Sequence, residues 1–175
     1  MSSTDQAPPE PFDQFVRRTW APLVRHAALL TGRHADAEDL VQAALEKVAP
    51  RWRRLDGDPE AYVRRTMINL NISRWRRHRG REVLRSDPHD RRDVAEPRTA
   101  GPEERGWDIA IALDALTAKQ RTVLVLRFIE DRTERETAAL MGVRLGTVKS
   151  ATRDALAAVR RVAPHLLDGS TVRTN

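Results

Sequence analysis

Apolar residues recur at helical spacing along most of this chain, and no stretch shows the alternation of apolar and polar residues that is typical of a strand. The first pattern runs from residue 12 to residue 30 and stops before Gly32, with apolar positions Phe15, Val16, Trp20, Leu23, Val24, Ala27 and Leu30. Pro22 lies inside it, and because proline removes a backbone donor, it predicts a kink or a division of this helix.

Two more helices are expected before residue 80. Asp36 is expected to cap the second helix, with Asp39 at its third position and an apolar face of Ala37, Leu40, Val41, Ala44, Leu45 and Val48. Pro50 and the Gly-Asp-Pro cluster at residues 57–59 break the chain again. A third pattern follows Pro59 and runs into a group of arginines, with apolar positions Tyr62, Val63, Met67, Ile68, Ile72 and Trp75.

Residues 133–161 carry the most informative pattern, a short helix, a glycine turn and a longer helix. Thr133 and Glu136 have the spacing of a capping box, and Gly142 can adopt the left-handed conformation that ends a helix. The second helix is expected to have one buried stripe, formed by Val148, Thr152, Ala155 and Val159. Polar side chains lie on its other sides near its N-terminal end, namely Thr147, Lys149, Ser150 and Arg153. This is the pattern of the helix-turn-helix that reads the DNA major groove, although many helical hairpins do not contact DNA.

Between these helical parts, the periodicity disappears. Residues 80–104 are rich in charge, proline and glycine, so they cannot bury enough apolar surface to offset the entropy of ordering. Helical periodicity resumes at residues 107–116 and continues through 121–129. The prediction is an all-α chain of two small helical domains, residues 12–79 and 105–164, joined by a flexible linker at 80–104, with a disordered arm at 1–11 and a tail at 165–175. Domains of this size must bury most of their large apolar residues.

Composition favours a polyanionic partner. The 175-residue chain has a formal net charge of +6, and a basic balance favours nucleic acid or an anionic membrane surface. A genome rich in G and C would explain the excess of arginine over lysine but not the net charge. The absence of cysteine excludes disulfides and thiolate metal sites. No apolar run approaches the roughly 20 residues of a membrane span, and the start of the chain does not resemble a signal peptide, so a cytoplasmic protein without membrane insertion is expected.

Signals for catalysis are weak. The acidic residues at 36–39 are explained by a solvated helix N-terminus, where carboxylates interact favourably with the helix dipole. The five histidines show no ligand spacing such as HxxxH, no glycine-rich phosphate loop exists, and no serine lies in a nucleophile elbow. We therefore expect no metal, no cofactor and no enzymatic activity.

A second segment with nucleic-acid character spans residues 62–79, where aromatic residues, amides and arginines are interleaved. Arginines neutralise phosphates, whereas aromatic faces and amides can hold unstacked bases. The alternative is a solvated basic helix with Tyr62 and Trp75 in the core, and the pattern alone leaves both interpretations open.

Three segments in this order resemble a known family: DAEDLVQAALEKV at 36–48, PEAYVRRTMINLNISRWRR at 59–77, and LDALTAKQRTVLVLRFIEDRTERETAALMGVRLGTVKSATRDALAAVRR at 113–161. The chain resembles small two-domain bacterial sigma factors of the extracytoplasmic-function group, in the sigma-70 family, and most of all the actinobacterial SigE family. The likeness covers about residues 12–162. It is specific because the motifs occur in the right order and at the right separations, whereas GTVKS alone occurs in other helix-turn-helix families.

The resemblance implies a fold of a sigma region 2-like helical bundle and a sigma region 4-like helix-turn-helix. It implies binding to core RNA polymerase through Asp39, Gln42 and Glu46, an acidic and amide-bearing face that suits a basic partner. The melted −10 promoter element would be held by Arg65, Arg74, Arg76 and Arg77 near phosphates, and by Asn69 and Asn71 in a loop that accepts a flipped base. The −35 element would be read as duplex by Arg144, Thr147, Lys149, Ser150 and Arg153. The linker would pass near the polymerase active-site channel, and an anti-sigma protein is a frequent partner in the family.

The chain departs from the family pattern at three places. Arg144 stands where a small capping residue such as serine is usual, and Ala151 stands where arginine is frequent. Leu116-Thr117 replaces the more usual Leu-Pro. The first two departures leave the −35 sequence preference open.

Two other function classes compete with a sigma factor. A stand-alone helix-turn-helix regulator would bind duplex DNA without polymerase, but it has no need of a basic, aromatic segment for single-stranded DNA. An enzyme acting on nucleic acid would need metal ligands or a nucleophile that the sequence does not offer.

Overall fold

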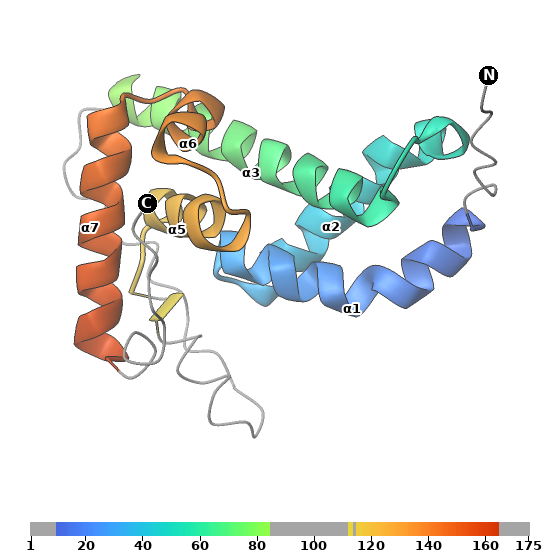
Figure 1. Cartoon of the computed structure of the whole chain (residues 1–175), viewed down its shortest axis with the longest axis horizontal. Coiled ribbons are helices and arrows are strands. Elements are labelled where there is room, and N and C mark those ends of the chain that lie inside the picture. The colour runs from blue at the N-terminus through green and yellow to red at the C-terminus, as the bar shows by residue number, and fades with distance from the viewer. Residues whose placement is uncertain (1–9, 85–111, 114, 165–175) are drawn as a thin grey trace, which may run out of the picture.

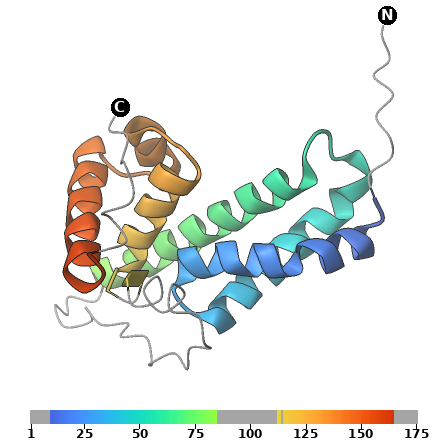
Figure 2. The same cartoon turned by 60° about the horizontal axis from the view of Figure 1, so that its bottom comes forward.

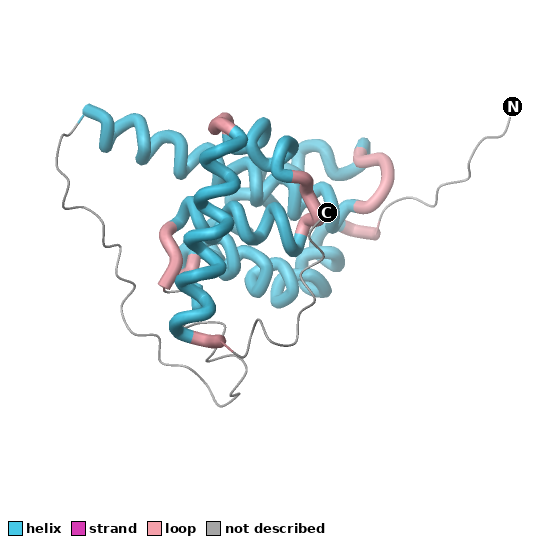
Figure 3. Tube along the Cα trace, turned by 60° about the vertical axis from the view of Figure 1, so that its left-hand side comes forward, coloured by secondary structure: helices cyan, strands magenta, loops and turns pink. Residues whose placement is uncertain are grey.

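The computed structural model describes residues 10–84, 112–113 and 115–164, and these ranges contain helices and turns but no strand (Figure 3). The prediction of an all-α chain is therefore confirmed. Helices α1, α2 and α3 run side by side, and α5, α6 and α7 gather at one end of them (Figure 1). We call the first group, with η1, the first module and the second group, with η2, the second module.

The first module consists of α1 (Phe12–Thr31), α2 (His34–Val48), the 3₁₀ helix η1 (Ala49–Arg54) and α3 (Pro59–Leu84). Helix α1 is a single helix that continues through Pro22, so it is not divided, and Gly32 ends it at a φ of 76°. The amphipathic spacing of each helix is realised in the core, whose largest fully buried side chains here are Phe15, Leu23, Leu30, Leu40, Val41, Val48, Val63 and Met67.

Two expectations about this module are wrong. Helix α2 begins at His34 with Arg33 as the N-cap, so Asp36 lies in the first turn, 3.7 Å from the Arg33 side chain, rather than at the cap. Trp20 does not join the buried stripe, since 36% of it is exposed. Thr19 takes the buried position in that turn. Its hydroxyl donates to the Phe15 carbonyl oxygen at 2.8 Å, so this buried polar group has a hydrogen-bond partner within the protein.

The second module consists of α5 (Ala118–Leu124), the π-helical turn η2 (Val125–Ile129), α6 (Glu134–Met141) and α7 (Leu145–Val162). Helix α5 begins with a capping box between Thr117 and Gln120. One small cluster of buried residues belongs to this module alone and contains Ala112, Leu116, Ala155, Ala158, Val159 and Ala163.

The two modules share a core. One continuous apolar cluster contains the buried residues of α1, α2 and α3 together with Val123, Val125, Leu126, Ala138, Met141, Val148 and Ala151 of the second module. Figure 2 shows α5 lying against the ends of α1 and α3. Small helical modules bury a smaller fraction of their surface than large domains do, so this packing adds burial to both.

Helix α3 crosses one of the predicted domain boundaries, all of which stay predictions. Helix α3 continues to Leu84, which is five residues beyond the expected end of the first domain at residue 79. The rest of the expected linker, most of the N-terminal arm and the tail lie outside the described residues, so those assignments stay predictions.

Candidate nucleic-acid and polymerase interfaces

The helix-turn-helix of the second module forms as its sequence predicts. The Thr133 hydroxyl accepts from the Glu136 backbone N–H at 3.2 Å, and the Glu136 carboxylate accepts from the Thr133 backbone N–H at 2.8 Å. The Thr133 hydroxyl also donates to this carboxylate at 2.7 Å, and the two bonds that the charged carboxylate accepts, from the backbone N–H and the hydroxyl of Thr133, lower the pKa of Glu136. Gly142 ends α6 at a φ of 63°, and Val143 N–H returns to the Ala138 carbonyl oxygen at 3.0 Å. Helix α6, the first helix of the motif, is therefore fixed at both of its ends by hydrogen bonds.

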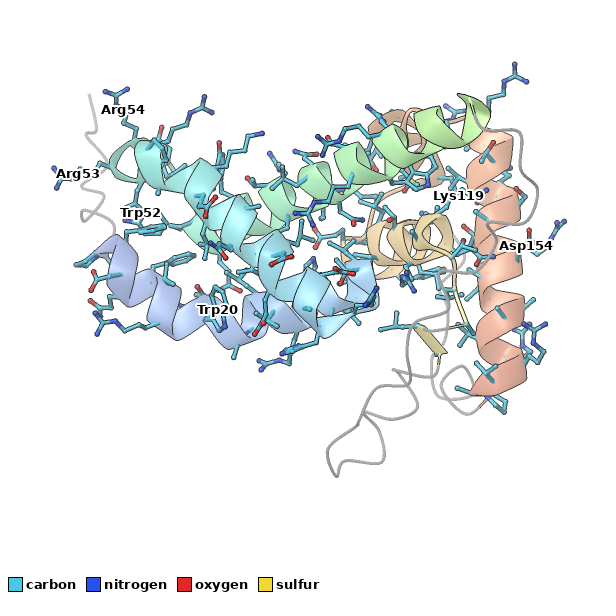
Figure 4. The ribbon with its side chains drawn as sticks, turned by 180° about the vertical axis from the view of Figure 1, so that it is seen from behind. Trp20, Trp52, Arg53, Arg54, Lys119 and Asp154 are labelled. Carbon is cyan, nitrogen blue, oxygen red and sulfur yellow. The ribbon has the colours of Figure 1, made fainter. Side chains whose placement is uncertain are left out.

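Helix α7 presents the expected polar residues beside this turn. Val148 and Ala155 anchor its apolar stripe, while Lys149 and Arg153 are exposed and Thr147 and Ser150 are half-buried. The Lys149 ammonium lies 3.8 Å from the Glu134 carboxylate, and Arg153 donates to Asp154, which projects from the outer side of α7 in Figure 4. The four side chains thus share the exposed N-terminal half of one helix.

The structure shows where the two departures from the family pattern, Arg144 and Ala151, lie with respect to α7. Arg144 is the N-cap residue in extended conformation, and no side-chain capping bond is found for it among the described residues. Ala151 is only 3% exposed and belongs to the core shared by the two modules. An arginine at position 151 would have to displace packed neighbours, so the small side chain is required by this packing.

The residues expected to contact polymerase lie together on α2. Asp39, Gln42 and Glu46 are all exposed, and their spacing places them on one side of the helix. The Gln42 amide donates to the Glu46 carboxylate at 3.0 Å. Because α2 is anchored by fully buried Leu40, Val41 and Ala44, this acidic and amide-bearing face sits on a rigid support.

The residues expected to contact the −10 element lie along α3, but not as predicted. Asn69 and Asn71 are within an uninterrupted helix, so the expectation of a loop at these positions is wrong. No glycine or proline interrupts residues 60–79, and the turn nearest to them in the first module precedes α3 at residues 55–58. Arg65, Asn69 and Arg77 are exposed, and Arg74 is half-buried.

Asn71 and Arg76 instead contact the second module. The Asn71 amide donates to the Thr122 hydroxyl at 3.0 Å. Arg76 donates to the carbonyl oxygens of Leu140 at 2.7 Å and of Met141 at 3.1 Å, at the end of α6. Two of the six expected −10 residues are therefore engaged within the protein.

The aromatic residues of the same segment pack into the protein in this structure. Tyr62 and Trp75 are half-buried and pack against the shared core. The sequence leaves open whether Tyr62 and Trp75 hold unstacked bases or pack in the core, and in this structure they pack against the core.

Sequence reasoning missed a basic group at the other end of the first module. Arg51, Arg53 and Arg54 are exposed on η1, and Figure 4 shows Arg53 and Arg54 projecting from the end opposite to α7. Between them, Trp52 packs at centroid distances of 5.1 Å from Phe12 and 4.7 Å from Phe15 and donates to the Glu10 carbonyl oxygen at 2.8 Å. The string RWRR could have indicated this group, since it combines cations with an aromatic residue.

No group of three or more metal-ligating side chains occurs within the described ranges. Among the helices that the structure describes, none is long and apolar enough to cross a membrane.

A basic helical module packed against a helix-turn-helix is the architecture of a DNA-binding protein. Residues 15–81 match the family model for Sigma-70 region 2, and residues 112–161 match that for Sigma-70 region 4. The chain is 37% identical over 155 residues to the RNA polymerase sigma-E factor of Streptomyces coelicolor, covering 85% of this chain and 84% of that protein. It is 34% identical over 153 residues to the ECF RNA polymerase sigma factor SigE of Mycolicibacterium smegmatis, covering 83% of this chain and 59% of that protein.

A solved structure is also similar. The sigma factor RpoE of Bartonella quintana, solved in complex with the anti-sigma factor NepR, superposes with a TM-score of 0.54 at 29% identity, covering 86% of this chain and 95% of that chain. The present chain therefore belongs to the sigma-70 family, in its extracytoplasmic-function group, and is an RNA polymerase sigma factor. The resemblance seen in the sequence is confirmed.

Proposed function

We propose that this sigma factor binds core RNA polymerase through the exposed face of α2 and directs it to promoters through α3 and α7. The observation that carries the proposal is that one chain presents three separate surfaces: the acidic face of α2, the arginine-rich side of α3 and the polar N-terminal half of α7. A stand-alone regulator needs only the last of these.

The polymerase contact is assigned to Asp39, Gln42 and Glu46. Replacing Gln42 and Glu46 together by alanine is expected to weaken binding of the full chain to core polymerase about tenfold, equivalent to about 1.4 kcal/mol. Asp13→Ala on α1, which removes an exposed carboxylate elsewhere, serves as the matched control. Unchanged affinity of the double variant for core polymerase would refute the interface assignment.

The promoter contacts are divided between the modules. Arg65, Arg74, Arg76 and Arg77, with Asn69 and Asn71, are proposed to bind the melted −10 strand, and Arg144, Thr147, Lys149, Ser150 and Arg153 the duplex −35 element. Since these contacts are dominated by cations, promoter affinity should fall steeply as salt rises.

The decisive experiment is run-off transcription with core polymerase, with and without this protein, on a library of genomic promoters. We expect discrete transcripts that depend on the added chain. If none exceeds the background of core polymerase alone, and the protein alone binds an operator tightly, a stand-alone regulator replaces this proposal.

Three further expectations follow from this role. The protein itself performs no catalytic step, because polymerase supplies the chemistry. Bacterial transcription takes place in the cytoplasm, so we infer that location. An anti-sigma protein is the class of inhibitor to expect, since the similar Bartonella factor was solved with one.

A further inference from the structure

Helix α7 carries an ion pair between two consecutive residues of its exposed surface, Arg153 and Asp154. The Nε and Nη2 atoms of the Arg153 guanidinium both donate to Oδ1 of Asp154, each at 3.1 Å. Consecutive side chains of a helix point in directions about 100° apart, so they do not normally face each other. The guanidinium is therefore turned sideways toward its neighbour, which projects from the outer side of α7 (Figure 4).

This ion pair contributes little to folding. The side chains of Arg153 and Asp154 are 78% and 53% exposed, and water screens the attraction between charges at such exposure. Helix α7 is held in the protein by its apolar side, where Val148, Ala151 and Ala155 are buried. The geometry of the pair thus affects what α7 presents to a partner rather than how α7 is packed.

The two hydrogen bonds use one edge of the guanidinium and leave another available. A guanidinium has five N–H donors in a planar fork. The edge formed by Nε and Nη2 faces Asp154, so the end formed by Nη1 and the second N–H of Nη2 points away from that carboxylate. Among the residues that the structure describes, no hydrogen bond is found for Nη1 of Arg153. The side chain can therefore still donate two parallel hydrogen bonds through its end.

The major-groove edge of guanine offers the pair of acceptors that fits this free end. Its O6 and N7 atoms accept two parallel hydrogen bonds from one arginine, which distinguishes guanine from the other bases. A carboxylate beside the guanidinium favours this contact in two ways. It fixes the orientation of the fork, and it offsets the positive charge that draws a lone arginine to phosphates, whose contacts carry no sequence information.

We propose that Arg153 reads a guanine of the promoter duplex and that Asp154 is the positioning residue that holds Arg153 for this contact. The inference rests on the proposed function of α7, and it adds the base that Arg153 recognises and a role for Asp154. Oδ2 of Asp154 takes no part in the two bonds to Arg153, so it can accept from the amino group of an adjacent cytosine or adenine.

Four variants separate this role from a general effect of charge. Asp154→Asn keeps the size of the side chain and removes its charge, which frees the guanidinium to contact phosphates. Asp154→Glu retains a carboxylate and should restore part of the wild-type behaviour. Arg153→Lys keeps the positive charge and removes the planar fork. Asp13→Asn is the matched control, because Asp13 also forms an exposed ion pair, 2.7 Å from Arg17, but lies on α1.

The first readout is the base preference of the full-length protein. Each protein, alone and with core polymerase, selects from a pool of short duplexes with a random central segment, and the selected DNA is sequenced. We expect wild type to prefer guanine at one position by about tenfold, as is typical of one bidentate arginine–guanine contact. Arg153→Lys and Asp154→Asn should reduce this preference to about threefold or less, Asp154→Glu should recover part of it, and Asp13→Asn should retain it.

The second readout is the salt dependence of binding to a labelled duplex that lacks the selected sequence, measured by fluorescence anisotropy. Asp154→Asn should bind this duplex more tightly than wild type at low salt. Its slope of log K against log salt concentration should be steeper by about 0.9, because the released arginine neutralises one more phosphate. Asp13→Asn should leave the slope unchanged. A merely structural role of Asp154 would instead weaken binding to every duplex and lower the helix content seen by circular dichroism.

Two results overturn this role of the pair. One is a wild-type selection without a guanine preference, and the other is a guanine preference that Arg153→Lys or Asp154→Asn leaves unchanged. In either case run-off transcription can still succeed, so the proposed function survives. Conversely, a guanine preference that depends on both residues in the protein alone, without any promoter-dependent transcription, would support the pair and refute the proposed function.

Discussion

Helices α3 and α7 both carry arginines and small polar residues, yet they differ in availability. On α7, Lys149 and Arg153 are exposed and pair with the neighbouring surface carboxylates of Glu134 and Asp154. On α3, Arg76 and Asn71 are bound to backbone and side-chain groups of the other module. The same residue chemistry thus gives one surface that is open in the free chain and one that is partly covered, and the difference arises from packing between modules.

The largest effect is expected where the shared core is disrupted. Leu126→Ala removes a fully buried side chain that joins both modules and should lower the free energy of unfolding by about 2–5 kcal/mol. Leu140→Ala, at a position that is 39% exposed, should change it by less than about 0.5 kcal/mol. Urea denaturation followed by circular dichroism measures both.

The shape of that denaturation curve sharpens the comparison. A single transition is expected, because one core connects the modules. Two separated transitions in the wild-type protein would mean that α3 and α7 belong to independent units and that the covering of α3 is transient.

A smaller effect is expected at the two helix starts of the helix-turn-helix. Thr133→Ala removes the hydroxyl that caps α6 and should cost about 1 kcal/mol, whereas Arg144→Ser would give α7 a capping hydroxyl and should add about 0.5–1 kcal/mol. Thermal unfolding of the two variants tests this contrast. A destabilised Arg144→Ser variant would show that the Arg144 side chain has a structural role beyond the cap.

The smallest effect is expected from acidification at the module boundary. Burial, which outweighs the opposite influence of Glu130, lowers the pKa of His26 below 6.5, and the charge of Arg64 lowers it further. The unfolded chain therefore binds a proton at a pH where the folded chain does not, so stability is full above pH 6.5 and falls as the pH drops below it. Urea denaturation at pH 7.5 and 5.5 should show this loss in wild type and in the exposed-site control His34→Gln, but not in His26→Gln. An equal loss in His26→Gln would assign it to another group.

Features that depend on neighbouring residues could be predicted from the sequence. The helical spacing gave the buried stripes, and the Thr133–Glu136 spacing gave the capping box, because both are set by the geometry of one or two helical turns. The observed N-cap of α2, Arg33, lies three residues before the expected one, because Asp36 satisfies the preferences of the first turn as well as those of the cap.

Features that depend on distant residues could not be predicted. Nothing in the spacing of α3 indicates that Arg76 meets Leu140, 64 residues away, since periodicity describes one helix at a time. The misplaced loop at Asn69 and Asn71 has a different origin. It was inferred from the family resemblance, while the unbroken helical pattern of the same residues indicated a helix.

The reciprocal placement of Gly32 and Gly142 limits how this protein can be recombined. At Gly32 and Gly142, an added Cβ atom would lie 2.5 Å and 2.7 Å from the guanidinium of an arginine that the other module contributes. In a chimera that takes its second module from a relative whose corresponding helix does not end in glycine, the Arg76 guanidinium would have to shift at the end of α6. An exchange of modules between relatives therefore leaves these two contacts undisturbed only when each arginine and the glycine that it approaches are both present in the chimera.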